Sequence, residues 1–153
     1  MMLPRSIRKS LPTFSVNVNM NMNIKIHNFT CSKQYCRNMI LKFDDMPLAI
    51  LPQFKGGDGE LRANMVFDGT NRILKGILVP GASIGVHKHE GNCEMIYVLS
   101  GCGTLLERDS EGLETMSYVT SGDCLYCPEG HIHSLMNTSC DEDLVFFAVV
   151  PKQ

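Results

Sequence analysis

The stretch from Gly81 to Gly101, GASIGVHKHEGNCEMIYVLSG, combines three side chains of the metal-binding type with the pattern of two β-strands. His87 and His89 are two residues apart, and this spacing puts both imidazoles on one face of a strand. The Gly-Asn pair that follows favours a turn, and Glu94 begins an apolar run that we expect to return alongside the first strand. Two imidazoles and a carboxylate form a mixed nitrogen and oxygen ligand set, which suits Fe, Mn, Ni, Zn or Cu.

A second stretch, GDCLYCPEGHIHSLMN over residues 122–137, could supply a fourth ligand through His133. Taken together, the two stretches resemble the two motifs of the cupin family, and every motif position is filled in the expected order. The first motif is matched by Gly81, His87, His89, Glu94 and Gly101, and the second by Gly122, Pro128, Gly130, His133 and Asn137. In both motifs we expect the glycines to form turns that need a positive φ or a close approach of the backbone, and Asn137 to cap the turn that follows it.

The remainder of the chain after about residue 60 reads as short strands separated by turns. Each candidate strand is an apolar or alternating segment that ends near glycine, proline, asparagine or aspartate. The candidates are 61–67, 72–79, 94–99, 104–108, 113–119, 124–127, 131–136 and 144–150, with 104–108 expected to pair with 113–119. No segment shows a 3.6-residue period, so we predict an all-β protein. The resemblance narrows this to a double-stranded β-helix, the jelly-roll cupin barrel, with the metal inside the barrel mouth.

The chain length of 153 residues and the ordinary composition, 44% hydrophobic and 20% charged, fit a single domain. We predict that residues 39–153 form the cupin barrel and that residues 1–38 are an extension outside it. The SVNVNMNMNIKI segment of this extension could form an edge strand or have no fixed structure, and the extension could dock on a partner subunit. The glycine-rich residues 54–60 are expected to be a flexible lead into the first barrel strand rather than a phosphate loop.

Charge and cysteine content argue against several function classes. A net charge of −2 provides no basic surface for nucleic acid, and no apolar run reaches the ~20 residues that span a bilayer. The 7 cysteines are an odd number without the spacing of a disulfide scaffold, and Cys124 and Cys127 would point to opposite faces of a strand. We therefore expect reduced thiols in a cytoplasmic protein that has neither nucleic acid nor membrane as a partner.

The resemblance implies that His87, His89, Glu94 and His133 hold one divalent metal ion and leave about two coordination positions open for water or a ligand. Fe, Mn, Ni and Zn all suit this ligand set, whereas the lack of thiolates argues against a soft copper site.

Residues that act beside the metal are harder to identify from the sequence. The candidates are Tyr126, His131 and Lys75, on segments expected near the barrel mouth, with His131 either a hydrogen-bond donor or proton carrier near the metal, or a histidine at the rim. Because neighbouring residues of a strand alternate in direction, one of Phe146 and Phe147 should line the interior.

Two function classes fit these features. In the first, a metal-dependent enzyme acts on a small polar organic molecule such as a sugar or organic acid, as cupin isomerases, lyases, decarboxylases and dioxygenases do, with the metal as Lewis acid or O₂-binding centre. In the second, the barrel binds or senses a small ligand without turnover. The resemblance also implies a homodimer, and the edge strands of a lone barrel favour such pairing.

Overall fold

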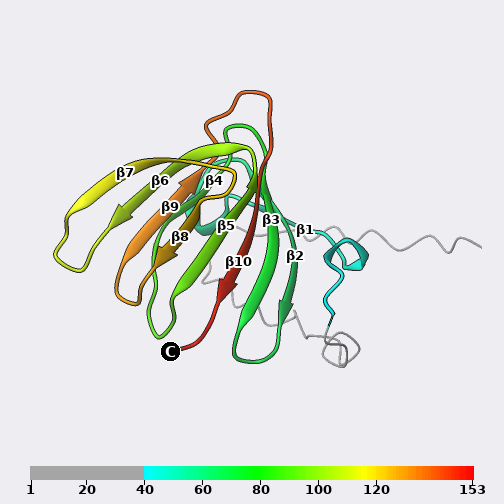
Figure 1. Ribbon diagram of the computed structural model, residues 1–153, viewed down its shortest axis with the longest axis horizontal. Coiled ribbons are helices and arrows are strands. Elements are labelled where there is room, and N and C mark those ends of the chain that lie inside the picture. Colours follow the sequence, from blue (N-terminus) through cyan, green and yellow to red (C-terminus); the bar gives the residue numbers. More distant parts are fainter. Residues whose placement is uncertain (1–39) are drawn as a thin grey trace, which may run out of the picture.

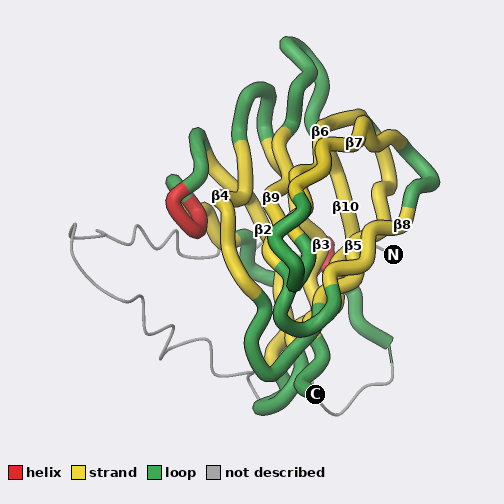
Figure 2. Tube along the Cα trace, turned by 90° about the vertical axis from the view of Figure 1, so that its left-hand side faces the viewer, coloured by secondary structure: helices red, strands yellow, loops and turns green. Residues whose placement is uncertain are grey.

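Two antiparallel β-sheets face each other in the computed structural model, which describes residues 40–153 (Figures 1 and 2). The elements are η2 (Phe43–Asp45), β1 (Ala49–Pro52), η3 (Phe54–Gly56), β2 (Glu60–Phe67), β3 (Arg72–Leu78), β4 (Ser83–Lys88), β5 (Glu94–Ser100), β6 (Cys102–Arg108), β7 (Glu114–Thr120), β8 (Cys124–Cys127), β9 (Ile132–Met136) and β10 (Leu144–Val150). The predicted all-β jelly roll is confirmed. The extension 1–38, with its possible edge strand, lies outside the described residues.

The strand order differs from the prediction at the first motif. One sheet has the order β1-β2-β3-β10-β5-β8 and the other β4-β9-β6-β7, so β4 and β5 lie in different sheets and do not form the expected pair. The physical reason is that backbone contacts hold the connection between β4 and β5 against the last residues of the chain. Asn92 forms a β-bridge with Lys152, and the Cys93 N–H donates to the carbonyl of Pro151. The chain therefore passes from one sheet to the other at this point, and the two halves of the motif lie in opposite sheets.

Most other strand expectations agree with the structure. The limits of the predicted strands are reproduced to within two residues, those of β8 and β10 without any change, and β6 pairs with β7 along its whole length. On β8, Cys124 is exposed and Cys127 buried, as alternation predicts, and both are free thiols. The glycine-rich residues 54–60 differ from the expected flexible lead-in, because three of them form η3, which packs against β4 (Figure 2).

The core lies between the sheets and is made by the inward-facing residue of each alternating pair. Phe146 is 1% exposed, whereas Phe147 faces outward and packs edge to face against Phe43 with ring centroids 5.9 Å apart. Burying a side chain of this size contributes about 1.5–3 kcal/mol. A Cβ on Gly76 of β3 would collide with the Phe146 ring, so the ring needs a glycine on the neighbouring strand.

The end of the barrel next to the β9–β10 connection is closed by Asn137, which is fully buried. Its Nδ2 donates to the carbonyls of Leu78 and Glu142, both at 2.8 Å, and its Oδ1 accepts from the Ser139 N–H at 2.9 Å. The predicted turn cap is therefore present. The motif glycines at 81, 101, 122 and 130 all have positive φ, as expected. None of the helices among residues 40–153 is long and apolar enough to cross a membrane.

Candidate metal centre

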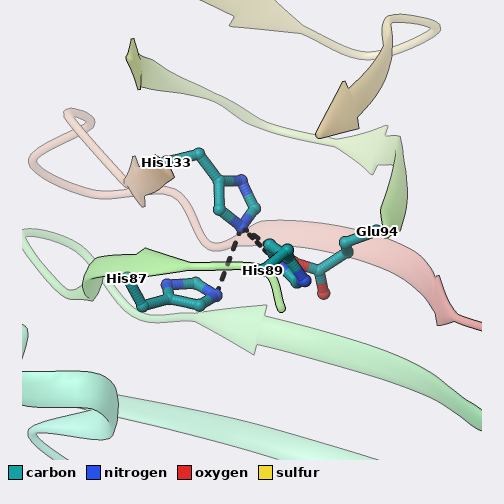
Figure 3. Close-up of side chains that lie close together, drawn as sticks. All are labelled: His87, His89, Glu94 and His133. Atoms are coloured by element: carbon teal, nitrogen blue, oxygen red, sulfur yellow. Dashed lines mark hydrogen bonds and ion pairs between the residues drawn. The ribbon is translucent and has the colours of Figure 1, made fainter. Parts of the chain in front are cut away.

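Four side chains that can ligate a metal converge between the two sheets (Figure 3). His87 lies in β4, His89 directly follows that strand, Glu94 begins β5, and His133 lies in β9. One possible ligand atom from each lies within 4.8 Å of all the others. His89, Glu94 and His133 are buried, and His87 is partly exposed. The crossing from β4 to β5 therefore brings together from opposite sheets the residues that the sequence places in one motif.

The spacing of the donor atoms fits a single small ion. His133 Nε2 lies 3.2 Å from His87 Nε2 and 3.0 Å from His89 Nε2. Glu94 Oε2 lies 2.9 Å from His133 Nε2 and 3.3 Å from His89 Nε2. Two ligands that are about 2.1 Å from a common ion and at right angles to each other are about 3.0 Å apart. The four groups thus have the separation expected of neighbouring ligands.

The hydrogen bonds of the imidazoles orient lone pairs toward this common point. His87 Nδ1 lies 2.9 Å from the carbonyl oxygen of Gly85, which can only accept, so the proton is on Nδ1 and Nε2 carries the lone pair. His89 Nδ1 lies 2.5 Å from Asn92 Oδ1, and the Asn92 amide is oriented by donation of its Nδ2 to the carbonyl of Glu90 at 3.1 Å. The Nε2 lone pairs of His87 and His89 therefore point toward the Glu94 carboxylate and the His133 imidazole. A cation at this point could accept both lone pairs and neutralise the carboxylate.

The pKa shifts in the cluster favour the same arrangement. Burial lowers the pKa of His87 to about 4, so this imidazole is neutral near pH 7. Burial alone would raise the pKa of Glu94, but hydrogen bonds with His133 and His89 outweigh burial and lower it to about 2. Burial alone would lower the pKa of His89, but hydrogen bonds with Glu94 and Asn92 outweigh it and raise this pKa. The cluster therefore holds an ionised carboxylate and attracts positive charge, and a metal ion that binds there displaces any proton on His89 Nε2.

A hollow of about 120 Å³ lies beside the cluster and is lined by His87, His89 and Glu94. Its walls are mainly apolar, with Phe146 and Leu74 among the lining residues, while Lys55 and Arg72 supply positive charge. Pockets that hold drug-sized ligands measure about 300–1,000 Å³. This hollow therefore suits a ligand of only a few heavy atoms.

The η3 turn forms one wall of the hollow and is held in an uncommon backbone conformation. Lys55 has a φ of 59° and Gln53 a φ of 49°, both in the left-handed region that residues other than glycine adopt rarely. The turn lies directly on Gly85 of β4, where a Cβ would collide with the carbonyl of Lys55 and the N–H of Gly57. The sequence of β4 thus allows this turn to approach the strand that carries His87.

The three residues predicted to act beside the metal do not join the cluster. Lys75 alternates with the buried Leu74 on β3, faces outward and pairs with Asp44 at 2.7 Å. Tyr126 is 52% exposed on the outer face of β8. His131 lies in the turn before β9, where strand alternation does not apply, and it does not line the hollow. Because facing depends on the register of each strand, these expectations about the barrel mouth were wrong for Lys75 and Tyr126.

Sequence reasoning missed three other residues near the cluster. Asn92 was assigned only to a turn, Lys55 to a lead-in loop, and Arg72 to the start of a strand, yet all three line the hollow. The sequence did contain a signal for Asn92, because a side-chain amide three residues after His89 can reach the His89 ring nitrogen and form a hydrogen bond with it. For Lys55 and Arg72 the sequence contains no such signal, because only the packing of η3 on β4 and the alternation of β3 reveal where they lie.

This chain is similar to a known protein family and to individual known proteins. The Cupin domain family matches residues 75–150. A protein of Thermotoga maritima called oxalate-binding protein is 28% identical over 118 residues, which cover 73% of this chain and 93% of that protein. The crystal structure of a predicted oxalate decarboxylase from Thermotoga maritima superposes with a TM-score of 0.67 at 27% identity, covering 75% of this chain and 100% of that one.

A larger protein is similar as well. Oxalate decarboxylase of Bacillus subtilis, which has Mn(II) centres, matches at 25% identity with a TM-score of 0.59, and the match covers 75% of this chain but 29% of that one. The family match begins on β3 and ends at the last residue of β10, so it contains all four converging side chains.

Proposed function

Because this chain is a cupin-domain protein in which three imidazoles and a carboxylate converge, we propose that it binds a divalent metal ion and, on that ion, a small carboxylate of the oxalate class. His87, His89, Glu94 and His133 are the proposed metal ligands. Fe, Mn, Ni and Zn suit this ligand set. The Mn(II) centres of the similar Bacillus subtilis enzyme make Mn(II) the first ion to test.

The observation that carries this proposal is the geometry of the cluster, in which four pairs of donor atoms are 2.9–3.3 Å apart and all four donor atoms lie within 4.8 Å of one another. A carboxylate ligand is supported by the charge of the site. Three neutral imidazoles and one carboxylate leave one net positive charge on a divalent ion, and Lys55 and Arg72 add positive charge at the hollow. The small hollow favours an organic acid over a sugar, and relatives named for oxalate support the same class.

The residues of the chain have distinct roles in this proposal. The Gly85 carbonyl and the Asn92 amide hold two imidazoles with Nε2 free for the ion. The apolar walls, including Phe146 and Leu74, exclude water and strengthen electrostatic interactions inside the hollow. A divalent ion bound there would supply Lewis acidity toward a carboxylate.

The proposal is tested by metal analysis and calorimetry on the full chain. We expect one Mn(II) per chain after loading and desalting, and saturable binding of oxalate that disappears when a chelator removes the metal. The matched control is the chelator-treated protein to which Mn(II) has been returned, which should regain oxalate binding. Failure to hold any divalent ion in stoichiometric amount, or equal oxalate binding with and without the metal, would overturn the proposal.

A second candidate function is catalytic turnover of the bound acid, supported by similarity to proteins called oxalate decarboxylases. Cleavage of the carbon–carbon bond of hydrogen oxalate gives carbon dioxide and formate, and the new carbon–hydrogen bond requires a proton. Among the described residues that line the hollow, Glu94 is the one carboxylic acid, and its proposed role is that of a ligand. Residues 1–39 contain neither aspartate nor glutamate, so they cannot supply another carboxylic acid. These features favour binding without decarboxylation.

Product analysis distinguishes the two functions. The Mn(II)-loaded protein is incubated with ¹³C-labelled oxalate, and formate and carbon dioxide are measured by NMR. Multiple turnovers per chain establish the enzyme, whereas bound and unchanged oxalate establishes the binding protein.

We also propose that the protein forms a homodimer. The supporting observation is an apolar outer face on β5 and β8, where Met95, Tyr97, Leu99 and Tyr126 are 39–52% exposed. Apolar surface of this kind is common at protein interfaces. Sedimentation analysis of the full chain should give twice the mass of one chain, and a monomer at micromolar concentration would contradict this part of the proposal.

A further inference from the structure

Arg72 is a cation on the inner face of the barrel that has no charged partner there. On β3, Leu74 and Leu78 are buried in the core, and alternation places Arg72 on the same face. Its side chain forms no ion pair or hydrogen bond with another described residue, in contrast to Arg62 and Arg108, which pair with glutamates. Its guanidinium carbon lies 5.9 Å from the ring centroid of Phe67.

The strand register puts Arg72 in line with a proposed metal ligand. Arg72 pairs with Val150 of β10, and Val149 of the same strand pairs with Met95 of β5. If this antiparallel register is continued by one residue, Val150 lies opposite Glu94. Arg72 and Glu94 are thus two strands apart on one inner face, or about 10 Å between backbones at about 4.8 Å per strand. An extended arginine side chain covers much of that distance.

Two hollows meet at this residue. The inner hollow of about 120 Å³ contains the proposed metal ligands, and a wider outer hollow of about 410 Å³ lies between the β2–β3 turn and the end of the chain. Arg72, Asn92 and Val150 line both. The C-terminus in Figure 1 marks the end of the barrel to which the outer hollow belongs. A ligand that enters from this end passes Arg72 before it reaches the cluster.

We infer that Arg72 binds the second anionic group of the ligand and thereby selects dicarboxylates over monocarboxylates. This inference rests on the proposed function, since the first carboxylate is assigned to the metal. A guanidinium suits this task because its planar N–H groups bond both oxygens of a carboxylate, which a lysine ammonium cannot do with the same geometry. Val150 and Phe67 beside the guanidinium are apolar and strengthen such an ion pair, and Glu90 is the one carboxylate among the residues that line the outer hollow.

The test compares Arg72→Met and Arg72→Lys with the natural chain and with Arg62→Met. Arg62 lies on the neighbouring strand β2, faces the other way from the core residues Leu61 and Ala63, and serves as the matched control. Each protein is loaded with Mn(II), and dissociation constants for oxalate and for formate are measured by calorimetry, together with the affinity for Mn(II) itself. Thermal melting of each variant verifies that it is folded.

We expect Arg72→Met to weaken oxalate binding about 10- to 100-fold, the range for loss of a charged hydrogen-bond partner, and formate binding by less than about 3-fold. Arg72→Lys should lie between Arg72→Met and the natural chain, while Arg62→Met and all Mn(II) affinities stay unchanged. If Arg72→Met does not fold, the comparison of Arg72→Lys, which keeps the charge, with the natural chain provides the test. The inference is overturned if oxalate binding is unaffected, or if oxalate and formate weaken equally. If the natural chain with Mn(II) binds no oxalate, the proposed function fails and this inference fails with it.

Discussion

The two ends of the barrel both bury polar side chains, but they satisfy them in different ways. His133 and Asn137 lie on one polypeptide segment, four residues or about 13 Å apart. Asn137 is surrounded by backbone groups, which take up both of its donated hydrogens and its oxygen. The buried groups around His133 have mainly one another as partners, and two of the imidazoles present lone pairs to a carboxylate. The closed end is complete within the chain, whereas we propose that a cation completes the other end.

This difference separates the part of the motif that stabilises the fold from the part that binds. A buried polar group with all its partners fixes the structure, and its loss leaves unsatisfied groups. A cluster of buried polar groups that have mainly one another as partners is costly to the fold and suited to a ligand. Substitutions at the two ends should therefore affect different measurements.

The largest effect is expected for His133→Ala, which removes the donor atom closest to all the others. We expect metal affinity to fall by more than the ~10- to 100-fold typical for loss of a ligand's hydrogen-bond partner, measured by metal content and chelator competition. His131→Ala is the matched control two residues away and should retain the ion. Unchanged metal affinity in His133→Ala would remove the distinction between the two ends.

Asn137→Ala should have the second largest effect, and on stability instead of metal binding. The substitution leaves the carbonyls of Leu78 and Glu142 without these donors, and each unsatisfied buried group costs about 1–3 kcal/mol. We expect the free energy of unfolding to fall by about 3 kcal/mol in urea titrations, while the folded protein keeps its Mn(II) affinity. Thr138→Ala, an exposed neighbour, should stay within about 0.5 kcal/mol. A stable Asn137→Ala with weakened metal binding would reverse the assignment of the two ends.

Asn92→Ala tests how far the cluster depends on groups that do not touch the ion. It removes the acceptor that keeps the His89 proton on Nδ1, so we expect Mn(II) affinity to fall about 10- to 100-fold. Asn92→Asp keeps an acceptor at the same position and should lose less. Chelator competition measures both, and the NMR signals of the His89 ring should show a changed tautomer in Asn92→Ala. Equal affinities in both variants and the natural chain would show that Asn92 does not orient the ligand.

The smallest effect is expected for Lys55→Gln, because Lys55 is exposed at the wall of the hollow. Exposed charge pairs contribute up to about 1 kcal/mol, so oxalate affinity should fall no more than about 5-fold. Because salt screens exposed charges, the difference from the natural chain should disappear as the ionic strength approaches about 1 M. Lys42→Gln is the control, since Lys42 is exposed and is not among the residues that line either hollow. An equal loss in both variants would show that only the overall charge matters.

Much of the fold and the candidate site could be predicted from local patterns. Strand limits followed from alternation and turn residues, and the four converging side chains were found because each lies at a fixed spacing within one of two contiguous motifs. The pairing of β4 with β5 could not be predicted correctly, since a short turn can lead back along a strand or across to a second sheet. The bridge from Asn92 to Lys152, distant in sequence, decides between these.

The sequence by itself determined that the protein is built of β-strands and which imidazoles and carboxylate could share an ion, because periodicity, turn residues and motif spacing are properties of neighbouring residues. Only the tertiary structure decided which strands face each other, that Lys75 and Tyr126 point away from the hollow, and that Arg72 and Lys55 line it. The physical reason is that a side chain's direction depends on strand register, and register is fixed by contacts between segments far apart in the chain.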